Sequence, residues 1–162
     1  MTPPLRVGVL FPTHLVAAIG IHRLSGWIGE RRDSTDSARE PTLSMWWLLV
    51  GASVPDLVDK PLAMAGITEL FHSVGHSALL LPLMAFAAAT SRHGVGLTVG
   101  WASHLILDAA HIVINGRPSD ALFLAWPVVI SPDPLALPPL AFVSYYLWSP
   151  SFFIEVLVWL AV

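Results

Sequence analysis

The chain alternates long apolar runs with short polar segments, and this pattern predicts helices. The first apolar run covers residues 7–28 and is interrupted by His14, His22 and Arg23. The polar segment GERRDSTDSARE follows at residues 29–40, with a Ser, Asp and Arg content typical of a loop. A run of about 20 apolar residues is long enough to cross a bilayer as a helix, so residues 7–28 are the first predicted span.

Three further runs precede residue 115. The second starts at Leu43 and passes through MWWLLVGASVPDLVDKPLAMAG. Because the residue before a proline avoids the α conformation, we expect this run to break or kink near Val54. The third run covers residues 74–90, and the fourth covers residues 95–114.

The C-terminal third has a different character. The stretch AWPVVISPDPLALPPL is rich in proline, so we expect a short reentrant or interfacial segment there. The last run, residues 141–162, is interrupted at Ser149 and Pro150 and predicts a broken fifth span. The predicted fold is an all-α integral membrane bundle of four core spans plus this broken one. It forms a single domain, residues 1–162, with a core at 8–115, a connecting segment at 116–140 and a C-terminal span at 141–162.

Composition supports a membrane location and excludes several functions. Hydrophobic residues make up 55% of the chain and charged residues 12%, whereas soluble domains have about 25% charged residues. We therefore expect a multi-pass protein of the cell membrane, with the lipid bilayer as its partner. A net charge of −3 with 8 Lys and Arg argues against nucleic-acid binding. The chain has no cysteine, which excludes thiolate ligands and cysteine nucleophiles.

Ionisable residues inside apolar spans are costly, and here they gather on one side of the membrane. Short loops make consecutive spans antiparallel, so the start of the first, the end of the second, the start of the third and the end of the fourth lie at one side. Helical spacing then places the groups within each span on one helix face. The candidates are His14, Asp56, Asp59, His72, His76, His104, Asp108 and His111.

Imidazoles and carboxylates without thiolates suit Zn²⁺, with Mn²⁺ and Fe²⁺ as less favoured choices. Eight candidates exceed the needs of one tetrahedral ion, so the pattern allows one or two ions that activate water for attack on phosphoesters or amides. Simpler interpretations remain open for single residues. His22 and His93 can be interpreted as packing residues that form hydrogen bonds. Asp59 can be interpreted as a partner of Lys60 or as a helix cap, and His111 as a structural residue.

Four motifs in order resemble a known family. They are TH at residues 13–14, GASVPDLVDKP at 51–61, FHSVGHS at 71–77 and GWASHLILDAAH at 100–111. Over roughly residues 8–115 the chain resembles the membrane-bound, metal-dependent hydrolases, and the helix carrying His104 and Asp108 is distantly similar to zinc-dependent phospholipases C. The resemblance implies metal ligation by His14, Asp56, His72, His76, His104 and Asp108.

Two positions depart from the family pattern. The second acid of its Pro-Asp-x-Asp motif is displaced from position 58, which is Val58, to Asp59. Ser73 stands where the family often has an arginine, so a phosphate would need Arg6, Lys60 or Arg117 instead.

The leading hypothesis is hydrolysis of a lipid or phosphoester substrate by metal-activated water near the membrane surface. In this hypothesis Asp59 is a catalytic general base or orients a ligand histidine. Arginines in the loops after the first and third spans favour a site on the outer side, although Arg6, Lys60 and Arg117 oppose this assignment. The alternatives are a metal or proton transporter and a non-catalytic metal- or haem-binding membrane protein.

Overall fold

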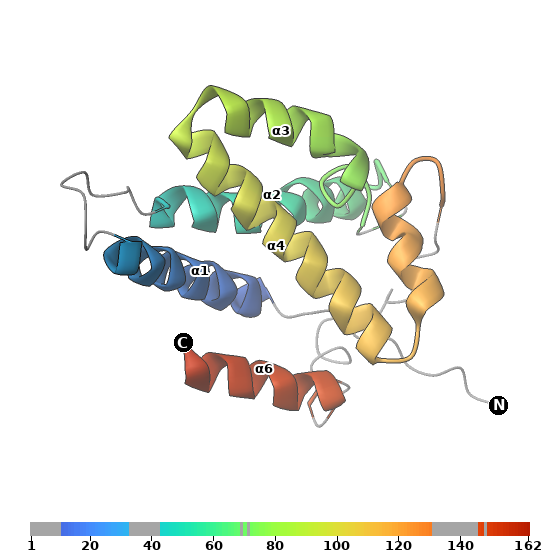
Figure 1. The fold of residues 1–162 in the computed structure, drawn as a ribbon. Coiled ribbons are helices and arrows are strands. Elements are labelled where there is room, and N and C mark those ends of the chain that lie inside the picture. Colours follow the sequence, from blue (N-terminus) through green and yellow to red (C-terminus); the bar gives the residue numbers. More distant parts are fainter. Residues whose placement is uncertain (1–10, 33–42, 69, 71, 131–145, 148) are drawn as a thin grey trace.

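The structure is a computed structural model that describes residues 11–32, 43–68, 70, 72–130, 146–147 and 149–162. The described part is helical and contains no strand, which confirms the predicted all-α class. Its elements, shown in Figure 1, are α1 (Phe11–Arg32), α2 (Met45–Met64), the 3₁₀ helix η1 (Ala78–Leu80), α3 (Leu81–Thr90), α4 (Arg92–Ile114), the 3₁₀ helix η2 (Pro118–Ala125) and α6 (Pro150–Ala161).

The crossing of α2 and α4 is the centre of the fold, and glycines set its distance (Figure 1). A Cβ atom at Gly51 of α2 would collide with the Leu97 carbonyl of α4, and one at Gly100 of α4 would collide with the Leu48 carbonyl of α2. The two backbones therefore touch at this point. This contact brings the acidic second half of α2 close to the second half of α4.

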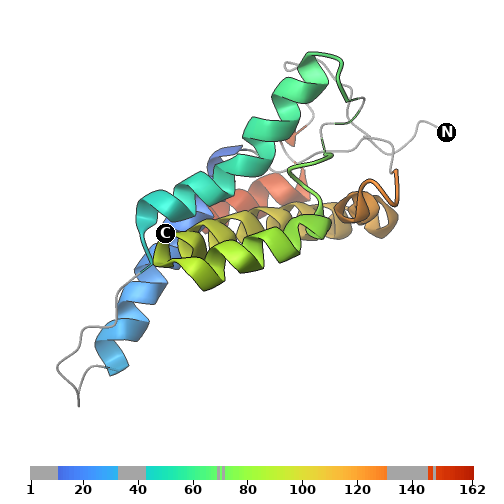
Figure 2. The same cartoon turned by 90° about the horizontal axis from the view of Figure 1, so that it is seen from above.

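The other helices pack around this pair. After a sharp turn at Ser91, whose side chain accepts a hydrogen bond from the Gly94 amide, α4 runs back alongside α3 (Figure 2). Helix α1 packs on α2, and α6 packs on α1. The apolar core has two parts, one at Ala18 and Leu48 and the other at Met84 and Trp101.

Two predictions on the N-terminal half were wrong. Residues 29–32 extend α1 rather than beginning the polar loop, whose remaining residues 33–40 lie outside the described part. Helix α2 also continues through Pro55 and Pro61, so, of the break or kink predicted near Val54, the break does not occur. Pro55 is buried against Gly75, and this tertiary packing compensates for the backbone hydrogen bond that a proline cannot donate.

The third predicted run begins later than expected. Residues 72–77 form bends and a turn, and helical structure starts at Ala78, where the Ser77 side chain accepts from the Leu79 amide. His72 and His76 therefore do not share a helix face. The fourth run is confirmed as α4.

Helix α6 begins at Pro150 with Ser149 as its cap, which is the position of the predicted interruption, and residues 141–145 and 148 of this run lie outside the described part. The 12 residues of α6 would extend about 18 Å, less than a bilayer core. Part of the connecting segment forms η2, whereas residues 131–140 lie outside the described part. Among the described helices, α4 is long and apolar enough to cross a membrane.

Candidate metal centre

The structure brings the six predicted metal ligands together in one cluster. They come from four segments of the chain, which are α1, α2, the irregular segment 72–77 and α4. Three overlapping groups each have ligand atoms within 4.8 Å of one another. These groups are His14 with His104 and Asp108; Asp56 with His76 and His104; and His72 with His76 and Asp108.

The Asp108 carboxylate is the hub of the cluster. Its Oδ1 atom lies 3.3 Å from the Nε2 atom of His14. Its Oδ2 atom lies 3.1 Å from Nε2 of His104, 3.5 Å from Nε2 of His76 and 3.9 Å from Nε2 of His72. All four histidines thus direct the same ring nitrogen toward one carboxylate.

Asp56 closes the cluster from the α2 side. Its Oδ1 atom lies 3.7 Å from Nε2 of His76 and 4.0 Å from Nε2 of His104. Its Oδ2 atom accepts a hydrogen bond of 2.6 Å from the Lys60 ammonium. One oxygen of Asp56 therefore faces the imidazoles, while the other faces a cation at the edge of the site.

The opposite ring nitrogens of two histidines are held by acceptors. Nδ1 of His76 lies 2.7 Å from the Asp59 carboxylate, and Nδ1 of His104 lies 2.7 Å from the Ala52 carbonyl oxygen. Since these oxygens only accept, both Nδ1 atoms carry hydrogen, and the neutral rings present lone pairs at Nε2. The two Nε2 atoms are 3.1 Å apart, so a cation, either a proton or a metal ion, must lie between them.

The carboxylates around His76 favour a proton on its ring. Burial lowers the pKa of His76, but hydrogen bonds and charge from the Asp108 and Asp59 carboxylates outweigh it and raise that pKa above its ordinary value. A divalent ion would replace this proton. The separation of the two nitrogens is close to the roughly 3.3 Å expected for ligands about 2.05 Å from a tetrahedral Zn²⁺ ion.

Asp59 accepts hydrogen bonds at both of its carboxylate oxygens. Oδ1 accepts from the Gly75 amide at 2.8 Å, whereas Oδ2 accepts from the Ser73 amide at 2.7 Å, the His76 amide at 3.2 Å and the His76 ring. Asp59 is fully buried. It does not pair with Lys60, which bonds Asp56 instead. The carboxylate therefore fixes both the backbone of the histidine segment and the ring of His76.

The site is buried on most sides. His14, His76 and His104 are at most 1% exposed. The His72 side chain is 27% exposed and the Lys60 side chain is 46% exposed, so these two residues mark the side from which a ligand would approach. The nitrogen and oxygen donors of the cluster fit the ligand preference of Zn²⁺.

The remaining histidines lie elsewhere. His22 hydrogen-bonds the Leu43 carbonyl through Nδ1 at 2.6 Å, as expected for a packing histidine. His93 packs against the ring of Trp47, with ring centroids 5.3 Å apart. Of the three proposed phosphate-holding cations, Lys60 lies beside the cluster, Arg117 pairs with Asp120 at 3.0 Å, and Arg6 lies outside the described residues.

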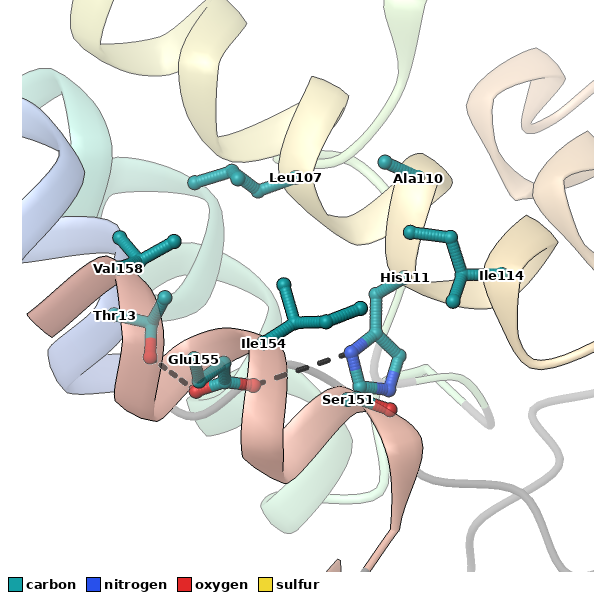
Figure 3. A pocket seen from close by; sticks show the side chains of 9 residues that line it. All are labelled: Thr13, Leu107, Ala110, His111, Ile114, Ser151, Ile154, Glu155 and Val158. Atoms are coloured by element: carbon teal, nitrogen blue, oxygen red, sulfur yellow. Dashed lines mark hydrogen bonds and ion pairs between the residues drawn. The ribbon is translucent and has the colours of Figure 1, made fainter.

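A second buried polar group, which the sequence analysis missed, lies between α6, α1 and α4 (Figure 3). Glu155 of α6 accepts a hydrogen bond from the Thr13 hydroxyl and lies 3.9 Å from Nδ1 of His111. His111 therefore joins this group rather than the metal-ligand cluster. Glu155 is the one acidic residue in the final apolar run, and this isolation was the available indication of its importance.

No protein-family model matches this chain, and no curated protein or solved structure matches it either.

Proposed function

We propose that this protein is a membrane-embedded, metal-dependent hydrolase that acts on a lipid-type phosphoester, as its resemblance to the membrane-bound, metal-dependent hydrolases implies. The observation that carries the proposal is the convergence of four imidazole Nε2 atoms on the carboxylates of Asp56 and Asp108. Packing histidines need one partner each, as Asp59 and the Ala52 carbonyl provide for His76 and His104, but packing does not require four Nε2 atoms to face one carboxylate.

The six clustered residues would hold the metal, with the Asp108 carboxylate at the centre of the cluster. Its Oδ1 atom faces His14, and its Oδ2 atom faces the other three histidines, so the two oxygens serve different sides of the cluster. This division suits two ions better than one, and zinc is the metal that the donor set favours. When bound, zinc lowers the pKa of water to about 7 and stabilises negative charge that develops on the substrate.

The protein's own residues would then have distinct tasks. Asp59 and the Ala52 carbonyl orient His76 and His104. Because both oxygens of Asp59 already accept hydrogen bonds, we assign Asp59 to positioning rather than to proton transfer. Lys60, half-exposed beside Asp56, is placed to receive the anionic group of a substrate.

Several features support a lipid environment and a lipid substrate. Large apolar side chains point outward from α2, α4 and α6, including Trp46, Ile106 and Leu160, each more than 65% exposed. An apolar groove of about 320 Å³ lies between α4, η1 and η2 and is lined by Trp101, Leu105 and neighbouring apolar residues. The groove lies on the helix that carries His104 and Asp108, and its lining includes none of the six clustered residues. It would accommodate a lipid chain.

The two alternatives have less support. A transport pathway needs polar groups distributed across the membrane, whereas His22 and His93 bond or pack away from the cluster. A haem site needs space between its axial histidines, whereas His14 and His104 stack with ring centroids 3.7 Å apart.

Metal analysis of purified protein with matched variants tests the proposal. His104→Ala and Asp108→Ala remove central ligands, and His93→Ala removes a histidine of the same helix outside the cluster. We expect one or two zinc ions per chain in the wild type and the His93 variant, and loss of zinc in both ligand variants. Hydrolysis of phosphatidic acid and of p-nitrophenyl phosphoesters should disappear with the zinc. Equal turnover in all four folded proteins would contradict the proposal.

A further inference from the structure

We propose that Glu155, on the C-terminal helix α6, is a positioning residue for the metal centre because it fixes Thr13 and thereby the neighbouring ligand His14. This inference rests on the proposed metal centre but does not depend on which substrate is hydrolysed. It assigns to α6, which contributes none of the six ligands, a role in the binding of metal.

The Thr13 hydroxyl is held by two side chains of α6. It donates to Oε2 of Glu155 and accepts a hydrogen bond of 3.0 Å from Nε1 of Trp159. Glu155 and Trp159 are four residues apart, so both project from one face of α6. Thr13 and Glu155 point toward each other (Figure 3) and are buried, at 2% and 6% exposure according to their accessible surface. The hydroxyl is thus fixed as both donor and acceptor.

His14 needs such an external support more than the other buried histidines do. His76 and His104 are each oriented by an acceptor at Nδ1, whereas Nδ1 of His14 is buried and has no hydrogen-bond partner among the described residues. His14 also lies in the first turn of α1, which begins at Phe11, and first turns lack intrahelical hydrogen bonds to their amides. Its ring stacks on His104, and the side chain of the preceding residue, Thr13, bonds α6.

A purely structural role explains the presence of Glu155 less well. The other groups around it include Leu107, Ile114, Ile154 and Val158, so an apolar residue would fill the space at a lower desolvation cost. The carboxylate instead accepts from the Thr13 hydroxyl and lies 3.9 Å from Nδ1 of His111. A buried acid that binds the residue beside a metal ligand is expected where precise placement of that ligand matters.

Cobalt substitution measures this placement directly. Glu155→Leu and Thr13→Val each remove the hydrogen bond, Glu155→Gln retains an acceptor for Thr13, and Ser151→Ala is the control. Ser151 lines the same cavity but bonds Asn115, so its loss affects α6 without affecting Thr13. The readouts are zinc affinity by chelator competition, the visible spectrum of the Co²⁺ protein, and thermal unfolding of the metal-free protein.

We expect Glu155→Leu and Thr13→Val to weaken zinc affinity by about tenfold, the lower end of the range for residues that support ligands. Both should also change the Co²⁺ spectrum, and the double variant should add little to either single one. Glu155→Gln should stay close to the wild type, and Ser151→Ala should match it.

The outcomes separate the two proposals. Wild-type zinc affinity and an unchanged Co²⁺ spectrum in folded Thr13→Val and Glu155→Leu proteins would overturn the positioning role and leave the metal centre intact. If Glu155→Leu does not fold, the Thr13→Val protein decides by the same criterion. A wild-type protein that binds neither metal would overturn the proposed metal centre, and the role of Glu155 would fall with it.

Discussion

At the scale of single residues, Asp59 shows how hydrogen-bond donors define the role of a carboxylate. It accepts three backbone amides and the Nδ1–H of His76, and none of its contacts leads to solvent. An asparagine in its place would turn one acceptor oxygen into an NH₂ group facing backbone N–H donors. The segment 72–77 and the ring of His76 would both lose their support.

We therefore predict that Asp59→Asn lowers zinc affinity by about 10- to 100-fold and reduces stability by about 1–3 kcal/mol. Asp120→Asn is the control, because Asp120 pairs with Arg117 outside the cluster. Chelator competition and thermal unfolding measure both effects. Full zinc affinity combined with lost turnover would instead identify Asp59 as the general base.

Residue chemistry explains what the sequence could and could not predict about the site. Histidines and aspartates in apolar runs are costly, so their positions alone indicated eight candidates, and the family resemblance implied the six of these that cluster in the structure. The role of Asp59 depends on donors 14 to 17 residues away, and that of Glu155 depends on a threonine 142 residues away. Contacts between such distant residues have no periodicity in the sequence, so both roles required the fold.

At the scale of elements, the segment 72–77 shows that a helical spacing does not establish a helix. His72 and His76 are four residues apart, yet the chain between them bends around Asp59, and Gly75 packs directly on Pro55. The two histidines converge because of these tertiary contacts. The spacing of His104 and Asp108 predicted their arrangement correctly, since α4 is a regular helix stabilised along its whole length.

The close contact between α2 and α4 yields a prediction about helix position. Gly100→Ala should separate the two helices, because the new Cβ would collide with the backbone of Leu48. We expect a loss of about 1–3 kcal/mol in stability from overpacking and weaker zinc binding, since Asp56 and Asp108 belong to the two helices that this contact holds together. Gly20→Ala is the control, because its Cβ would meet only the side chain of Val162. Equal zinc affinity in the two variants would show that the crossing does not control the site.

At the scale of the whole molecule, the ligand cluster joins segments that are far apart in the chain. It connects α1, α2, the segment 72–77 and α4, and α6 reaches it through Thr13. Without a metal ion, the imidazoles and carboxylates of these segments can lie this close together only when bound protons offset their repulsion. The membrane bundle predicted from composition stays a prediction, since α4 is the one described helix that meets the length and hydropathy expected of a span.

Metal removal should therefore destabilise the entire protein rather than the site alone. Zinc at 100 times its dissociation constant would stabilise the folded state by about 2.7 kcal/mol, and chelation should remove this contribution and lower Tm. Because zinc requires neutral imidazoles and the pKa of His76 lies above its ordinary value, the stabilisation should be complete above that raised pKa and should diminish as the pH falls through it. Thermal unfolding in detergent, with and without chelator at several pH values, measures both effects. The His104→Ala protein supplies the control, since its Tm should respond neither to zinc nor to chelator; a chelator-dependent Tm in that variant would place the stabilising ion elsewhere in the molecule.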